Sequence, residues 1–307
     1  MKDKTAGVFL LTRDNDYQRL QEADALATAR RLKVPITVSF AENEARLQVK
    51  QIEDFVDTHP ADSVVIVEAV DDESLAGIAH RAAGLGMGWF LLHRSASYMY
   101  GLRSEFPALA MSMVTADHKE IGRIQGKQFV ALLRGRGTVL YVCGPQGASA
   151  ANDRTAGMKE IIQGTPIDCH IVHGDWTEKS GEEKVAAWLR ASDETTSLLR
   201  LVGCQNDAMA TGALRALTRG AAMLGRDHLA HLPVTGVDGT PEHGIPMVDR
   251  HRLAATVIMP PAAGHAIELV HQTWSTPGFS PPVLVRQSVR SYPELAVVAL
   301  KTGKSLL

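Results

Sequence analysis

The segment Val202–Leu217, VGCQNDAMATGALRAL, places three polar side chains where a short apolar run meets a helical pattern. Gln205, Asn206 and Asp207 offer amide and carboxylate groups, which together donate and accept hydrogen bonds. A helix start needs only one capping side chain, and Asn206 or Asp207 could supply it alone. The surplus points to a ligand, because ligands of open α/β sheets bind outside the carboxyl ends of the strands.

Polar and aromatic residues recur at other junctions of the same kind. Helix capping, solvation or core packing is the plain alternative to ligand contact at each of them. Together, however, they offer carboxylate acceptors, guanidinium donors and rings that cover apolar faces, and a sugar or polyol needs this mixture. The residues so placed are Asp14, Asp16, Tyr17, Glu68, Arg94, Arg154, Trp176, Asn206 and Asp238.

The chain lacks the sequence motifs of the common catalytic and cofactor sites. The segment GPQGASAANDR is a glycine-containing loop before a helix, but it lacks the GxxxxGK[ST] spacing of a phosphate cradle. GxSxG is absent, no HExxH or similar metal spacing occurs among the 12 histidines, and the acids form no evident glycosidase pair. We therefore predict a protein that is not an enzyme, with no catalytic residue, metal or cofactor.

Composition fits a globular chain with two cores. The 307 residues are 45% apolar and 21% charged, with a net charge of −2, so neither nucleic acid nor an acidic membrane surface is an expected partner. No run approaches the roughly 18 apolar residues that span a bilayer. The first apolar run is too short for a secretory signal. We expect a periplasmic protein if a leader was removed, and a cytoplasmic one if Met1 is the native start.

Helical patterns alternate with apolar runs along the whole chain, as in AGVFLL, DSVVIVEAV, GTVLYVCG and SLLRLVGC. Continuous apolar runs are typical of parallel strands with helices on both faces of the sheet. The pattern predicts an α/β fold of two doubly wound, Rossmann-like parallel-sheet lobes joined by a multi-strand hinge. The expected lobes are 1–116 plus 259–285, and 117–258 plus 286–307. Cys143, Cys169 and Cys204 lie in or beside such runs and are expected to be buried thiols.

Three segments in this order resemble the type I periplasmic binding proteins for sugars, the ribose- and galactose-binding group that serves ABC importers. They are GPQGASAANDRTAGMKEI, CQNDAMATGALRAL and GVDGTPEHGIPMV with RLAATVIMPP, and the likeness covers nearly the whole chain. The resemblance implies that Arg94, Arg154, Asn206 and Asp238 bind sugar hydroxyls and that Trp176 stacks on the ring. On this reading Asn206 is a ligand group and Asp207 caps the helix.

The first lobe departs from the family pattern. DNDY stands where NPFF or NPFW is common, so Asp16 replaces an aromatic residue while Tyr17 remains. His93 stands where an Asp is common, Glu68 where an Asn is frequent, and Met259 where a Gln is frequent. His93 and Met259 therefore join the candidate ligand-binding residues. The extra acids favour a donor-rich ligand, such as a polyol, inositol or amino sugar.

The resemblance implies reversible sugar or polyol binding between the lobes, with hinge closure read by the membrane subunits of an ABC importer. We expect a monomer. One alternative is the ligand-sensing domain of a lac-repressor-type regulator, which shares the fold. Another is a chemosensory protein that docks on a histidine kinase. The sequence does not name the sugar.

Overall fold

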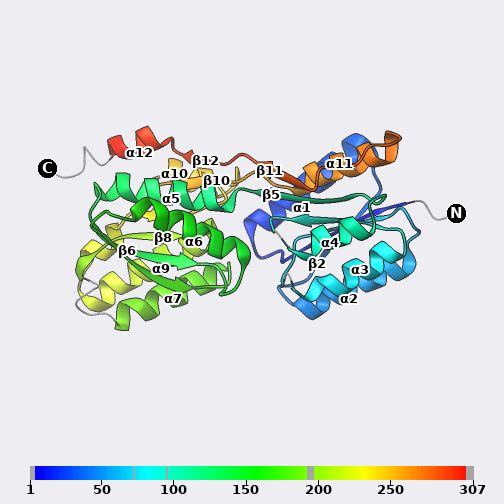
Figure 1. The fold of residues 1–307 in the computed structure, drawn as a ribbon. Helices are drawn as coiled ribbons and strands as arrows, with labels where there is room; N and C mark the ends of the chain where they lie inside the picture. The colour runs from blue at the N-terminus through cyan, green and yellow to red at the C-terminus, as the bar shows by residue number, and fades with distance from the viewer. Residues whose placement is uncertain (1–3, 72, 95, 192–196, 302–307) are drawn as a thin grey trace. The chain divides into compact units, whose positions relative to one another are not determined.

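The computed structural model describes residues 4–71, 73–94, 96–191 and 197–301. The chain folds into two compact units (Figure 1). Unit 1 comprises Met1–Ala116 and Pro261–Gln287, and unit 2 comprises Asp117–Pro260 and Ser288–Leu307, so the chain passes between them three times. Met259, which the sequence analysis assigned to the first lobe, lies in unit 2. Both units carry a parallel sheet with helices on its two faces, so the predicted fold class is confirmed.

Unit 1 is built on a six-stranded parallel sheet in the order β11-β5-β4-β3-β1-β2. Its inner strands are fully buried, because helices cover both faces. The strands are β1 (Ala6–Leu10), β2 (Ile36–Phe40), β3 (Val64–Val67), β4 (Gly88–Leu92), β5 (Met111–Ala116) and β11 (Leu284–Gln287).

Alternate residues of these strands enter two separate cores, since successive side chains point to opposite faces of a sheet. Val8 packs with α1 (Asp16–Leu32) and α11 (Ala263–Ser275). Phe9 packs in the opposite core, against the second set of helices. That set consists of α2 (Ala45–Thr58), the short η1 (Glu73–Leu75), α3 (Ala76–Gly84) and α4 (Tyr98–Glu105).

Unit 2 is built on a four-stranded parallel sheet in the order β7-β6-β8-β9. A separate antiparallel pair of three-residue strands, β10 (Thr256–Ile258) and β12 (Arg290–Tyr292), was not predicted as a pair. The sheet strands are β6 (Gly137–Cys143), β7 (Ile167–His173), β8 (Leu199–Cys204) and β9 (Val234–Thr235).

The helices of unit 2 also cover two faces. Phe129 of α5 (His118–Leu133) and Met158 of α6 (Ser149–Ile162) share one core, whereas α7 (Glu178–Ala191) and α9 (Asp207–Leu224) pack in the other. The other helices described in this unit are η2 (Asp227–His231), α10 (Gly244–Asp249) and α12 (Leu295–Lys301).

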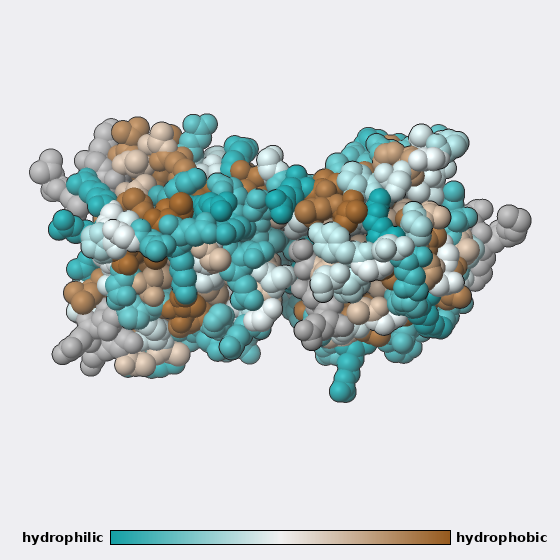
Figure 2. Space-filling view, in the orientation of Figure 1, coloured by the Kyte–Doolittle hydropathy of each residue, from teal (hydrophilic) through white to brown (hydrophobic). Residues whose placement is uncertain are grey.

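The described surface is mixed in character. Figure 2 shows apolar residues in small separate groups among hydrophilic ones on the face in view. Within the described ranges, no helix combines the length and apolar character needed to cross a membrane. The three cysteines are free thiols, with Cys143 and Cys204 buried and Cys169 partly exposed.

Candidate functional site

In unit 1 the candidate residues follow three neighbouring strands, β1, β3 and β4, at their carboxyl ends. The side chains of Tyr17 and His93 meet there: Tyr17 Oη lies 2.8 Å from His93 Nε2, and both residues are buried. Their rings pack edge to face at 5.3 Å between centroids. The structure therefore brings together one aromatic and one imidazole that the sequence placed 76 residues apart.

Glu68 follows β3 and belongs to a buried hydrogen-bond network. Its Oε2 atom accepts from Gln18 Nε2 at 3.0 Å and from Gln21 Nε2 at 3.3 Å. Gln21 Oε1 in turn accepts from the backbone N–H groups of Ala262 and Ala263, at the start of α11. The sequence analysis missed these glutamines, although two amides three residues apart on the buried face of a helix were a readable signal.

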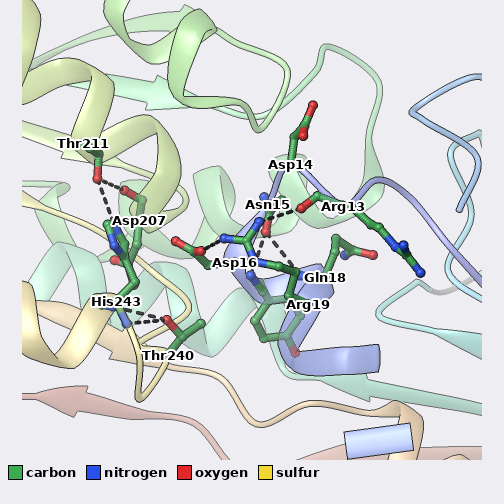
Figure 3. A network of polar contacts seen from close by, with 12 residues as sticks. Arg13, Asp14, Asn15, Asp16, Gln18, Arg19, Asp207, Thr211, Thr240 and His243 are labelled. Carbon is green, nitrogen blue, oxygen red and sulfur yellow. Dashed lines mark hydrogen bonds and ion pairs between the residues drawn. The ribbon is translucent and has the colours of Figure 1, made fainter. Parts of the chain in front are cut away.

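Local contacts hold Asn15 and Asp16 at the first junction. Asn15 caps α1, because its side-chain oxygen accepts from the N–H groups of Tyr17 and Gln18 (Figure 3). Asp16 forms an ion pair with Arg19 in the first turn, and Asp14 is exposed. The ion pair suits dipole stabilisation in the first helical turn, which is the plain alternative to ligand binding for Asp16.

Arg94, which follows β4, is also buried. Its Nε and Nη2 atoms each donate to Ala69 O at 3.4 Å. The carbonyl of Ala69 lies just beyond β3, so this contact ties the ends of two adjacent strands together.

In unit 2, close approach of α5 and α6 positions Arg154. A Cβ atom on Gly122 would lie 1.9 Å from Arg154 O, and one on Gly157 would lie 2.0 Å from Lys119 O. Only glycine permits helices to pack this closely at those points. The Arg154 side chain is consequently buried, with 3% exposure, at the carboxyl edge of the sheet.

The guanidinium of Arg154 lies close to residues from four segments of unit 2. It donates to the carbonyl of Gln205, its Nη2 lies 3.3 Å from Met259 Sδ, and its Cζ lies 5.5 Å from the centre of the Trp176 ring. His118 Nδ1 lies 3.4 Å from its Nε. Arg154 thus joins two other candidate residues, Trp176 and Met259, into one cluster.

Trp176 lies against backbone rather than deep in the core. A Cβ atom on Gly144 would lie 2.0 Å from Trp176 Cζ2, so the ring packs directly on that glycine. Trp176 itself is partly exposed. Its carbonyl accepts a hydrogen bond from Asn206 Nδ2 at 2.8 Å, which adds Asn206 to the same cluster.

The expectation that Asp207 caps the helix is wrong. Asn206, not Asp207, caps α9, because Asn206 Oδ1 accepts from Met209 N at 2.8 Å. The extended backbone of Asn206 leaves its side chain in the capping position, whereas Asp207 is already the first helical residue.

Asp207 instead anchors the loop 236–244. It accepts from Gly239 N and from Thr256 Oγ1, each at 2.8 Å. A Cβ atom on Gly236 or on Gly244 would lie 2.0 Å from one of its carboxylate oxygens. The loop therefore wraps the buried carboxylate, and this fixes the position of Asp238 between the two glycines Gly236 and Gly239.

Asp238 is buried and connects back to the cluster, since its carbonyl accepts from Met259 N at 3.1 Å. The structure thus places the five unit 2 candidates in one connected group, which we call the unit 2 cluster. Its members are Arg154, Trp176, Asn206, Asp238 and Met259.

Three candidate residues have unusual backbone geometry. His93, Trp176 and Asp238 have φ angles of 52°, 72° and 110°, in the region that favours glycine. Residues held in such conformations concentrate at functional sites, where the surrounding structure keeps them in place. Lys33 and Arg134 share such φ angles as ordinary helix C-caps, so the geometry supports the three candidates only together with their burial and contacts.

A buried amide and phenol form the base of the unit 2 cluster. Gln205 Oε1 accepts from Gly144 N, and its Nε2 donates to Tyr141 Oη at 3.2 Å, while Tyr141 donates to Gln125 Oε1. Burial raises the pKa of Tyr141 well above its usual value, so the phenol remains a donor. Gln205 therefore has a structural role.

The donor set contains amides, guanidinium groups, imidazole and aromatic rings. Among the described residues, no group of three or more histidine, cysteine or acidic side chains is arranged to hold a metal ion. The arrangement can hydrogen-bond hydroxyl groups and cover an apolar ring face.

Known proteins share this fold and sequence pattern. A family model described as a periplasmic binding protein domain matches residues 6–272. The galactofuranose-binding protein YtfQ of Escherichia coli K12 is 25% identical over 308 residues, covering 98% of this chain and 92% of that protein. The lactose operon repressor of Escherichia coli K12 is 26% identical over 172 residues, 53% of this chain and 45% of the repressor. A crystal structure of a galactofuranose binding protein matches with a TM-score of 0.80 at 22% identity, over 98% of both chains.

Proposed function

Because the chain belongs to the periplasmic binding protein domain family, we propose that it binds a small sugar or polyol reversibly and without chemical change. The observation that carries the proposal is the unit 2 cluster, in which Arg154, Trp176 and Asn206 meet at the carboxyl edge of the sheet. A planar guanidinium next to an aromatic ring suits hydroxyl groups on a ring of C–H bonds.

Unit 1 carries a second group of candidate ligand-binding residues. Tyr17, His93 and Arg94 lie at the carboxyl ends of adjacent strands and offer a phenol, an imidazole and a guanidinium. As the family resemblance implies, ligand binding drives the hinge closure that a partner reads. Asp14 and Asp16 contribute less, since Asp16 pairs with Arg19 in the first turn of α1 and Asp14 is exposed beside the cap.

The ligand is a neutral sugar or polyol. Glu68 accepts from Gln18 and Gln21, and Asp16 pairs with Arg19, so these two acids give weaker support for an amino sugar than the sequence alone suggested. The similar protein YtfQ is named for galactofuranose binding, which supports a furanose among the first sugars to test.

The partner is the membrane component of an ABC-type importer, and the protein acts in the periplasm. The family match supports both proposals. The gene sequence upstream of Met1 tests the location: a signal peptide in frame supports export, and a promoter directly before Met1 contradicts it.

Isothermal titration against furanoses, pyranoses, inositols and linear polyols tests the function. We expect saturable one-to-one binding of at least one neutral compound, which NMR then recovers unchanged. Arg154→Ala removes a guanidinium from the site and should abolish binding, whereas Arg190→Ala removes an exposed one from unit 2 and should not. Failure of every neutral compound to bind, or its conversion to a product, contradicts the proposal.

The similarity to the lactose operon repressor favours a second candidate, the ligand-sensing domain of a transcription regulator. Binding of duplex DNA at low salt separates the two functions, because phosphate contacts are strongest there. Salt-sensitive DNA binding would establish the regulator, and its absence alongside sugar binding supports the importer component.

A further inference from the structure

Unit 2 carries a pocket of about 330 Å³ between α9 and the segment around α10. No member of the unit 2 cluster is among its described lining residues. Thr211 and Arg215 line it from α9, His243 and Met247 from the start of α10, and Arg250 and Arg252 from the segment after that helix. The proposed sugar site makes no use of this pocket.

The charge around this pocket is predominantly positive, although the whole chain has a net charge of −2. Arg215 pairs with Glu178 at 2.5 Å. The side chains of Arg250 and Arg252 make no hydrogen bond or ion pair with any described residue, and Glu242 is the acid on the rim. Two exposed guanidinium groups with no partner among the described residues therefore border the pocket.

The walls of the pocket are held in place by hydrogen bonds (Figure 3). Thr211 Oγ1 donates to Asp207 O and lies 3.0 Å from His243 Nε2. Thr240 Oγ1 accepts from the N–H groups of His243 and Gly244. These hydrogen bonds fix the wall beside the exposed arginines, so this wall need not reorder when a ligand binds.

We propose that this pocket binds a small molecule with two or more oxyanion groups, carboxylates or phosphates. Guanidinium forks match both groups in geometry and charge. The volume lies at the lower end of the range of small-molecule sites, which suits a compact polyanion. Glu242 and His243 of the pocket wall belong to the loop 236–244, which also carries Asp238. An anion bound in the pocket therefore contacts the same loop as the proposed sugar site.

Titration calorimetry of the sugar-free protein at low ionic strength tests the proposal, with citrate as the polycarboxylate and pyrophosphate as the polyphosphate. We expect saturable one-to-one binding of at least one of them and none of acetate. The preference between the two identifies the carboxylate or the phosphate source. Since no sugar is used, the outcome does not depend on the proposed function.

Variants locate the binding. Arg250→Ala with Arg252→Ala should weaken it at least about tenfold, since charge-assisted hydrogen bonds are among the strongest. Arg136→Ala with Arg190→Ala removes the same charge from exposed positions of unit 2 and should leave it unchanged.

Substitution of Arg250 and Arg252 by lysine keeps the charge but removes the planar guanidinium that forms two parallel hydrogen bonds. This variant should have an intermediate affinity. This pair of substitutions also serves if the alanine variant does not fold. Absence of saturable binding to wild type, or equal losses in the two alanine double variants, would overturn the proposal.

Discussion

The buried carboxylate of Asp207 provides a test of how the loop 236–244 is held. Asp207→Ala removes the acceptor of Gly239 N and of Thr256 Oγ1, each at 2.8 Å. Hydrogen bonds to a charged group contribute about 1.5–3 kcal/mol each, so their loss should lower the free energy of unfolding by about 3–6 kcal/mol. Asp207→Asn keeps one acceptor and the side-chain size, and should cost less.

A second substitution separates anchoring from a general loss of packing. Gly236→Ala places a Cβ atom 2.0 Å from Asp207 Oδ1, and such overpacking costs about 1–3 kcal/mol. Once Asp207 is alanine, the nearest remaining atom of the original contact is its Cα at 3.2 Å. The Gly236→Ala cost should therefore fall in the Asp207→Ala background.

Urea unfolding of the two single variants and the double variant measures this coupling. We expect the double variant to be more stable than the sum of single effects predicts, by at least about 1 kcal/mol, because residues in contact couple in this range. Additive effects, within about 0.5 kcal/mol, would show that the loop does not wrap the carboxylate as described.

Three further predictions follow from the site and from one half-buried acid, Asp24 of α1. Trp176→Ala should weaken sugar binding by about 1–3 kcal/mol in calorimetry, with an unchanged circular dichroism spectrum, and an unchanged dissociation constant would count against ring stacking. Arg154→Lys keeps the charge but loses the fork, so we expect at least about a tenfold weaker affinity and, in small-angle scattering, incomplete compaction with ligand. Native affinity with full compaction would make Arg154 a structural residue. Burial raises the pKa of Asp24 above its ordinary 3.8, so its ionisation lowers the free energy of unfolding as pH rises through the folded pKa. Asp24→Asn should therefore be more stable than wild type at pH 7 and equal to it at pH 3, and the reverse order in urea unfolding would refute this reasoning.

The fold was largely readable because each central strand is an apolar run bounded by turn residues. Val64–Val67 and Gly88–Leu92 are fully buried, as their composition indicates. The pairing of β10 with β12 was not readable, since each has three residues and they are separated by more than thirty positions. Short strands carry too little periodicity to show which partner they choose.

The sequence predicted where the candidate residues lie, at the strand ends, but it did not predict which residues they contact. The rule that ligands lie beyond strand ends placed Tyr17, His93 and Arg154 at the correct edges of their sheets. It could not show that Glu68 meets Gln18 and Gln21, because these partners lie 50 and 47 residues away on a different element. The roles of Tyr17, His93 and Arg154 as ligand groups remain predictions.

Asn206 shows why residue type alone left two roles open. Its Oδ1 atom caps α9, and its Nδ2 atom donates to the carbonyl of Trp176, so one amide serves as both acceptor and donor. An aspartate in that position could cap the helix but could not donate to Trp176. Trp176 has a φ of 72°, a conformation that a bulky residue keeps only when its surroundings fix it. The two hydrogen bonds thus explain the choice of asparagine at this position, and its role as a ligand group stays a prediction.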